Sequence, residues 1–202
     1  MKKLLFSILP VAALGLVTLS SVSDPLPIGA AAPNADLKMK DISGKEVSLN
    51  DAKKKNGLLV MFSCNTCPYV IKNQSRTNEI AKYALDKEIG IAILNPNEAY
   101  RDDQDSYEAM KQYAVDQGYA WYYLVDKNHT MADAFGANRT PECFLFDKNG
   151  KLVYHGAIDD NPSDASAVSR KHLKEAINEI TNGKDVSVKQ SKSVGCTIKR
   201  LK

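Results

Sequence analysis

Short apolar runs separated by polar segments recur along the middle of the chain. Residues 58–62, 91–94 and 121–125 are nearly continuous apolar runs, which is typical of buried strands in a sheet covered on both faces. Between and after these runs, apolar residues return at helical spacing, which indicates helices that pack on the sheet. The predicted helices span 68–88, 105 or 106 to 117, 130–135 and 169–181.

Two further segments have the pattern of hairpins. Near the N-terminus, apolar positions alternate with polar ones between Leu37 and Leu49, on either side of the turn at 43–45. Later, the apolar runs 144–146 and 152–154 flank Asp-Lys-Asn-Gly, a strong turn signal. The element order predicts an α/β fold with a central mixed sheet flanked by helices and an N-terminal β-hairpin extension. Most strands are expected to be parallel, and the closing hairpin adds antiparallel ones.

The two ends of the chain differ from this domain in composition. Lys2 and Lys3 precede an apolar stretch over 4–19, and small residues then lead up to Asp24. This is the layout of a secretory signal peptide, here assigned to residues 1–23. The stretch is shorter than the ~20 apolar residues that a membrane span needs. We therefore expect a periplasmic or secreted protein, attached to a membrane only if the segment is uncleaved.

Composition limits the number of domains and the kind of partner. The chain has 202 residues, 44% of them hydrophobic and 25% charged, which suits one soluble domain, assigned to 24–184, followed by a polar tail over 185–202. The net charge of +3 is too small to indicate nucleic acid or an acidic membrane surface as a partner. With 7% aromatic residues, the chain also offers no platform for stacking bases.

The clearest candidate for chemistry is the Cys-x-x-Cys motif formed by Cys64 and Cys67, placed where the run 58–62 turns into the helix beginning at Pro68. Free backbone N–H groups at a helix N-terminus favour a thiolate. The Cys pKa in such motifs falls from about 8.5 to roughly 3.5–7.5. We expect Cys64 to be the exposed nucleophile and Cys67 to attack a mixed disulfide formed on it. The motif therefore predicts a thiol–disulfide oxidoreductase that needs no cofactor.

A Cys-x-x-Cys motif can also hold a metal, so a zinc- or copper-binding module is an alternative function. Such a module needs further ligands. These would have to come from Cys143, Cys196 or the three histidines, none of which forms a second close-spaced pair. A purely structural disulfide within the motif is less favoured still, because it closes too small a loop to stabilise the fold much.

Thr140 and Pro141 form the second candidate feature, directly before an apolar strand. Pro141 is consistent with an ordinary turn proline at the start of a strand. It is also consistent with a cis-proline lying against the redox pair, although only about 5–6% of X–Pro bonds are cis. The residues alone leave both interpretations open.

Three segments together resemble a known family. Phe-Ser-Cys-Asn-Thr-Cys-Pro-Tyr-Val at 62–70, Tyr-His-Gly-Ala-Ile-Asp-Asp at 154–160 and Ser-Val-Gly-Cys-Thr-Ile-Lys at 193–199 are similar to the Cys-x-x-Cys-bearing, peroxiredoxin-like subgroup of the AhpC/TSA family, within the thioredoxin-like redoxins. The resemblance covers roughly residues 27–183. It implies a thioredoxin-like fold, a redox pair at Cys64 and Cys67, and a cis-Pro141 that positions the backbone of a partner protein.

The chain departs from peroxiredoxins at the positions that activate peroxide. With Cys64 as the reacting thiol, Met61 takes the place of the hydroxyl residue and Gly57 that of the proline. Pro141 stands where an arginine is usual, leaving Arg139 and Thr140 as possible accessory residues. We therefore expect disulfide exchange with protein thiols and disulfides through an unidentified redox partner. A peroxiredoxin-like thiol peroxidase is the main alternative.

Two cysteines lie outside the motif. Cys143 falls on an apolar strand and is expected to be a buried, inert thiol. Cys196 lies in the polar tail and is open to three interpretations: a surface thiol, a resolving thiol for the redox pair, or a partner of Cys143. Because an unpaired, exposed thiol is easily oxidised outside the cytoplasm, we favour pairing or redox participation.

Overall fold

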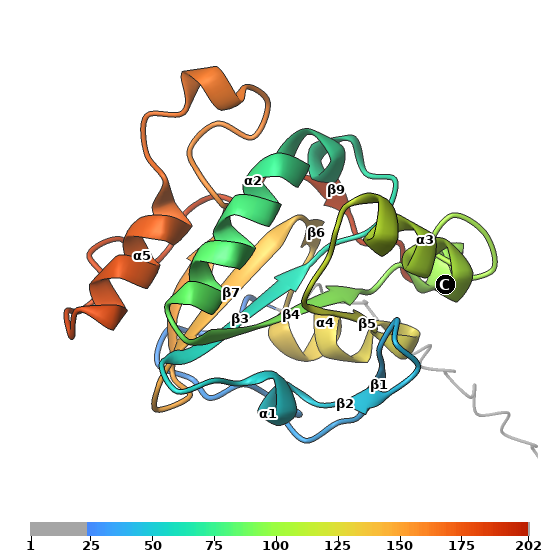
Figure 1. Ribbon diagram of the computed structural model, residues 1–202, viewed down its shortest axis with the longest axis horizontal. Helices are drawn as coiled ribbons and strands as arrows, with labels where there is room; N and C mark the ends of the chain where they lie inside the picture. The colour runs from blue at the N-terminus through green and yellow to red at the C-terminus, as the bar shows by residue number, and fades with distance from the viewer. Residues whose placement is uncertain (1–23, 202) are drawn as a thin grey trace, which may run out of the picture.

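The computed structural model describes residues 24–201, so the predicted signal segment lies outside the described residues. Five strands form a central mixed sheet, with β3 and β4 side by side in its middle (Figure 1). β3 pairs antiparallel with β7, β7 pairs antiparallel with β8, and β4 pairs parallel with β5. The strands are β3 (Gly57–Phe62), β4 (Ile89–Asn95), β5 (Tyr122–Val125), β7 (Glu142–Asp147) and β8 (Leu152–Gly156).

Helices cover both faces of this sheet. Helices α2, α3 and α5 share one apolar cluster with the sheet, and α1 and α4 share another. β3 contributes to both clusters, since Leu59 and Met61 join the first while Val60 and Phe62 join the second. Because side chains alternate across a strand, coverage of both faces explains why β3 is apolar throughout. The helices are α1 (Leu49–Ala52), α2 (Pro68–Asp86), α3 (Tyr107–Asp116), α4 (Thr130–Phe135) and α5 (His172–Thr181).

The mixed sheet with helices on both faces and the N-terminal hairpin confirm the architecture expected from the sequence. The hairpin consists of β1 (Met39–Lys40) and β2 (Glu46–Val47), paired antiparallel. The parallel pair β4–β5 and the antiparallel hairpin β7–β8 agree with the predicted mixed sheet, in which β7 also pairs antiparallel with β3. Leu49 begins the short helix α1 rather than extending the hairpin. Ser48 and Asp51 form a capping box at its start, which satisfies backbone groups that a strand would pair elsewhere.

Helix α5 begins three residues later than the pattern predicted, at His172. The preceding residues form hydrogen bonds within the loop instead. The Ser169 amide donates to the Asp160 carboxylate at 3.0 Å, and the Arg170 carbonyl accepts from the Asp160 amide at 3.1 Å. These loop contacts compete with the first helical turn.

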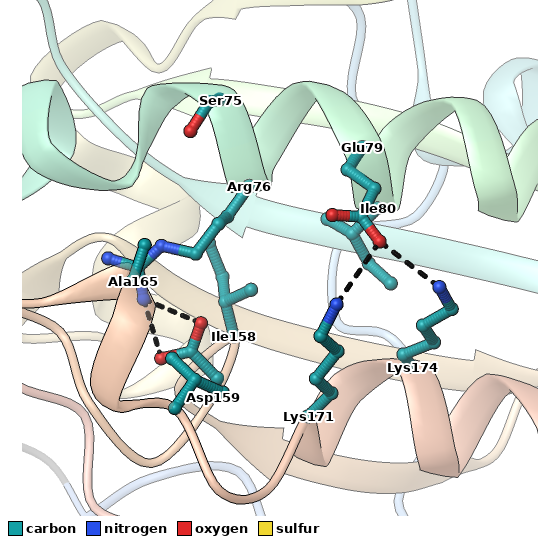
Figure 2. A pocket seen from close by; sticks show the side chains of 10 residues that line it. Ser75, Arg76, Glu79, Ile80, Ile158, Asp159, Ala165, Lys171 and Lys174 are labelled. Carbon is teal, nitrogen blue, oxygen red and sulfur yellow. Dashed lines mark hydrogen bonds and ion pairs between the residues drawn. The ribbon is translucent and has the colours of Figure 1, made fainter.

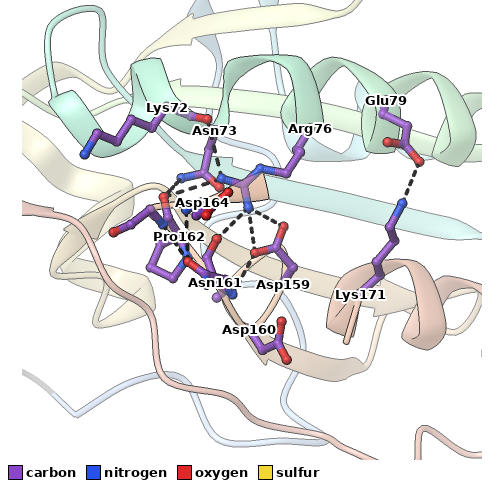
Figure 3. A network of polar contacts seen from close by, with 12 residues as sticks. Lys72, Asn73, Arg76, Glu79, Asp159, Asp160, Asn161, Pro162, Asp164 and Lys171 are labelled. Carbon is purple, nitrogen blue, oxygen red and sulfur yellow. Dashed lines mark hydrogen bonds and ion pairs between the residues drawn. The ribbon is translucent and has the colours of Figure 1, made fainter. Parts of the chain in front are cut away.

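The long connection between β8 and α5 is tied to α2 by buried polar contacts (Figure 3). Nη1 of Arg76 donates to both carboxylate oxygens of Asp159, at 2.8 and 2.6 Å, and to the Asn161 carbonyl at 2.7 Å. Nδ2 of Asn73 donates to the Pro162 carbonyl at 3.0 Å. The ion pair is largely buried, with side chains 11% and 3% exposed, so it fixes the path of the loop.

After α5, the chain returns across the molecule as residues 189–200, called here the C-terminal segment. It first runs beside β8, where the Ser191 amide donates to the His155 carbonyl at 3.0 Å. It then forms β9 (Cys196–Thr197), which pairs antiparallel with β6 (Arg139–Thr140). Figure 1 shows β9 and β6 together beyond the N-terminal end of α2. The segment thus brings Cys196 to the Cys-x-x-Cys end of the sheet.

Candidate redox site

The Cys-x-x-Cys motif lies where the sequence placed it, between a buried strand and a helix. β3 ends at Phe62, Cys67 is the N-cap residue of α2, and Pro68 occupies its first turn. Pro68 suits this position because the amide it lacks would have no partner within the helix. Cys64 and Cys67 join Val70 in one small apolar cluster.

The burial of Cys64 differs from the expectation. Its side chain is 1% exposed, and that of Cys67 is 4% exposed, so the expectation of an exposed nucleophile was wrong. The partly buried Tyr69 and Cys196 pack against the cluster, and Thr140 meets it from β6. Thr140 and Cys196, which are distant in sequence, therefore help to cover the two cysteines, and the local pattern around the motif does not reveal this.

The Thr140–Pro141 peptide bond is cis, as the family resemblance implied. Thr140 is fully buried and faces both cysteines of the motif. Its hydroxyl lies 3.4 Å from Sγ of Cys64, and its carbonyl oxygen lies 3.2 Å from Sγ of Cys67. The structure thus brings Cys64, Cys67, Thr140 and Pro141 together at one point.

The electrostatics of Cys64 also differ from the expectation of an acidic thiol. Burial raises its pKa above the ordinary value, and the negative charge of Asp105 adds to this effect. The Thr140 hydroxyl and the backbone amides of Cys67 and Thr66 act in the opposite direction. The helix N-terminus therefore favours the thiolate as predicted, but loss of water around the sulfur outweighs it.

Asp105 is a site residue that sequence reasoning missed. Its acidic neighbours in the sequence indicate a solvated loop, yet Asp105 is fully buried. One carboxylate oxygen accepts from the Asn65 backbone amide at 2.8 Å and from Nδ2 of Asn95 at 2.7 Å, and the other accepts from Nδ2 of Asn97 at 2.9 Å. Asp105 therefore fixes the loop between the two cysteines. Ser106, and not Asp105, caps α3.

Cys67 forms a disulfide with Cys196, with a Cα–Cα distance of 6.0 Å, while Cys64 and Cys143 are free. The bond expected within the motif is therefore not the one present here. Pairing of Cys196 with Cys143 was also wrong. Cys143 lies on β7 opposite Met61 and is fully buried, away from β9. Burial raises the pKa of its thiol strongly, in line with the expected inert thiol.

The loop before Pro141 is fixed by Glu142 and not by Arg139. One oxygen of Glu142 accepts from the Asn138 and Arg139 amides at 2.8 and 3.0 Å, and the other lies 2.7 Å from Nε2 of His155.

The exposed Arg139 side chain donates to the Gly195 carbonyl at 3.2 Å. Arg139 thus contacts the C-terminal segment, and no contact joins it to Cys64 within residues 24–201.

A separate cavity lies between α2 and α5 (Figure 2), away from the cysteines. Its charged side chains pair with one another: Lys171 and Lys174 with Glu79, and Arg76 with Asp159. No cysteine is among the residues that line it. The cavity is therefore not part of the redox site.

The described part of the chain offers neither a metal site nor a membrane-spanning helix. No group of three or more His, Cys, Asp or Glu side chains within it is arranged to hold a metal ion, so the zinc or copper alternative has no ligand set there. Over the same residues, no helix combines the length and the apolar character needed to cross a membrane.

Known proteins resemble this chain in sequence and in structure. The family model Redoxin matches residues 27–171. Thiol-disulfide oxidoreductase ResA from Bacillus anthracis is 29% identical over 130 residues, which are 64% of this chain and 69% of that protein. An uncharacterized conserved protein from Geobacillus kaustophilus has a TM-score of 0.80 at 33% identity, over 87% of this chain and 93% of that chain.

A further structural likeness concerns the fold alone. The thioredoxin domain of a thiol-disulfide oxidoreductase from Bacteroides vulgatus has a TM-score of 0.54 at 23% identity, over 65% of this chain and 89% of that domain.

Proposed function

The chain belongs to the Redoxin family, and we propose that it is an exported thiol–disulfide oxidoreductase that exchanges disulfides with proteins through Cys64 and Cys67. The observation that carries this proposal is the position of Thr140, whose hydroxyl faces one sulfur at 3.4 Å and whose carbonyl faces the other at 3.2 Å. The activity in the name of the ResA relatives supports the same reaction.

In the first step, the Cys64 thiolate attacks one sulfur of a substrate disulfide. A bond forms between Cys64 and that sulfur, the substrate disulfide breaks, and the other substrate sulfur leaves as a thiolate that takes up a proton. The Thr140 hydroxyl and the amides of Thr66 and Cys67 stabilise the negative charge on Cys64 before the attack. The cis-Pro141 loop lies beside the sulfurs and is the surface against which the partner's backbone would be positioned.

In the second step, the Cys67 thiolate attacks Sγ of Cys64 in the mixed disulfide. The Cys64–Cys67 bond forms, and the substrate leaves fully reduced. This step needs Cys67 as a free thiol, and the first step needs access to Cys64. We therefore assign substrate reduction to the form in which the Cys67–Cys196 bond is open.

Reduction of insulin disulfides by the full chain, with dithiothreitol as reductant, tests this function. Cys64→Ser and Cys67→Ser should fall to the rate without protein, because each lacks one of the two attacking sulfurs. Cys143→Ser is the matched control, since that thiol is buried and inert, and it should retain the parent rate. A Cys64→Ser protein as fast as its parent would contradict the proposal.

Export and protein substrates are separate parts of the proposal. The segment 1–23 supports export, and fractionation of cells expressing the full chain, followed by N-terminal sequencing, tests it. We expect the mature chain outside the cytoplasm, beginning at Asp24. A chain retained in the cytoplasm with Met1 intact would contradict this part alone.

One observation favours peroxide reduction as a second candidate. The sequence spacing offers no hydroxyl near the reacting thiol, but the structure supplies that of Thr140, 3.4 Å from Cys64. A buried thiol is also easier for a small peroxide to reach than for a protein disulfide. Stopped-flow mixing of reduced protein with hydrogen peroxide tests this candidate. Oxidation of Cys64 no faster than that of a free small thiol would exclude it.

A further inference from the structure

We propose that Cys196 is a third redox-active cysteine, and that the disulfide moves between the pair Cys64–Cys67 and the pair Cys67–Cys196. This inference rests on the proposed function, because it uses Cys64 as an attacking thiol. It adds an outer cysteine to the motif and gives the C-terminal segment a role in the reaction.

The C-terminal segment is fixed on both sides of Cys196 by contacts that involve no cysteine. Before it, the Ser191 amide donates to the His155 carbonyl at 3.0 Å. After it, the Ile198 amide donates to the Asn138 carbonyl at 3.1 Å, and the Lys199 amide donates to Oδ1 of Asn97 at 2.9 Å. These bonds do not depend on the disulfide, so Cys196 remains beside Cys67 after the disulfide opens.

The same segment approaches the cis-proline loop closely. In the pairing of β9 with β6, Cys196 stands opposite Thr140. A Cβ atom at Gly195 would lie 2.2 Å from the Thr140 carbonyl oxygen, so only glycine permits this approach. Thr140 is also the residue that faces both sulfurs of the motif. Cys64, Cys67 and Cys196 therefore all lie next to Thr140.

The three sulfur-bearing residues differ in exposure. Cys64 and Cys67 are 1% and 4% exposed, whereas Cys196 is partly exposed. A thiol in solution therefore meets Cys196 before the other two. When a reductant attacks Cys196, the leaving sulfur is that of Cys67, the N-cap residue of α2, where free amides stabilise a thiolate.

The internal step is a thiol–disulfide exchange that needs no external oxidant or reductant. The Cys64 thiolate attacks Sγ of Cys67, the Cys64–Cys67 bond forms, and the Cys67–Cys196 bond breaks. Cys196 leaves as a thiolate and takes up a proton, while the proton of Cys64 has gone to solvent. The reverse step returns the disulfide to Cys196. A disulfide formed at the buried Cys64 can thereby be transferred to the partly exposed Cys196. A dithiol in solution can then reduce it there.

Trapping the exchange in the oxidised protein alone, with no substrate present, tests this proposal. Oxidised wild-type protein is incubated with N-ethylmaleimide, quenched with acid and mapped by peptide mass. Each time Cys64 attacks Cys67, Cys196 is released and alkylated, so the label should collect on Cys196 with a disulfide left between Cys64 and Cys67. In Cys64→Ser the Cys196 label should be at least about tenfold lower, because the attacking thiol is absent.

Controls and a second variant keep the test decisive. Cys64→Ala repeats the measurement if the serine variant folds poorly. Cys143→Ser should label Cys196 as the wild type does, and oxidised Cys196→Ser should contain the Cys64–Cys67 disulfide. The proposal is overturned if Cys196 in the wild type stays unlabelled and bonded to Cys67, or if Cys64→Ser labels it equally fast. Insulin reduction is measured separately. The internal exchange and the proposed function can therefore be contradicted independently of each other.

Discussion

The hydroxyl of Thr140 lies 3.4 Å from Sγ of Cys64, although the two residues are 76 positions apart in the chain. We predict that Thr140→Val, which keeps the shape but removes the hydroxyl, raises the Cys64 pKa further. A hydrogen bond to a charged group contributes roughly 1.5–3 kcal/mol, which corresponds to an increase of about one to two pKa units.

The measurement is the ultraviolet absorbance of the thiolate as a function of pH. In a Cys67→Ser/Cys143→Ser/Cys196→Ser protein, Cys64 is the one cysteine left of the four, so it is the thiol that titrates. Thr140→Val is added to this background. An unchanged titration curve would show that the hydroxyl does not stabilise the thiolate.

The pH dependence of the internal exchange follows from the pKa of Cys64, which burial and the Asp105 charge raise above the ordinary value of a cysteine thiol. At pH values more than about one unit below that pKa, the thiolate fraction, and with it the rate of Cys196 labelling, should rise about tenfold per pH unit. The rate should therefore still be rising at pH 9. The maleimide concentration is kept saturating at each pH, so that trapping is not limiting. A rate that levels off below pH 8 would mean that Cys64 is a more acidic thiol than its surroundings indicate.

The ion pair between Arg76 and Asp159 should matter strongly for stability. Arg76→Ala leaves the Asp159 carboxylate, 3% exposed, without its cation, which should lower the free energy of unfolding by about 3–5 kcal/mol. Urea unfolding followed by circular dichroism measures this. Lys55→Ala is the matched control, because Lys55 pairs with Glu88 on the surface with side chains 76% and 58% exposed; its effect should be below about 1 kcal/mol. Equal effects would contradict a structural role for the buried pair.

Gly195 should control how fast Cys196 pairs with Cys67. In Gly195→Ala the added Cβ would lie 2.2 Å from the Thr140 carbonyl oxygen, so β9 must move away from β6. We expect formation of the Cys67–Cys196 disulfide from reduced protein to slow at least about tenfold, because exchange requires the two sulfurs to meet. Acid-quenched alkylation at successive times measures the rate.

Ser193→Ala provides the comparison within the same segment. Its buried hydroxyl has no hydrogen-bond partner among the described residues, so this variant should oxidise at the wild-type rate. If Gly195→Ala did so as well, the close approach of Gly195 to Thr140 would not be needed to place Cys196.

Much of the fold could be predicted because the relevant signals are local. The apolar run of β3 reflects burial on both faces, Pro68 marks the first turn of α2, and the turn at 147–150 joins β7 to β8. Each of these signals lies within a few neighbouring residues. The antiparallel place of β7 beside β3 could not be inferred in this way, because strand order is decided by contacts between distant segments.

For the site, the residue pattern was enough to place Cys64 and Cys67 at the junction of a strand and a helix, and the family resemblance added Pro141. The burial of Cys64, the hydrogen bond from the Asn65 amide to Asp105, and the Cys67–Cys196 disulfide across a sequence separation of 129 became evident in the folded structure. They could not be inferred earlier because burial, electrostatic environment and disulfide partner depend on which distant segments fold against a residue. The residues next to a cysteine along the chain do not indicate which distant segments these will be.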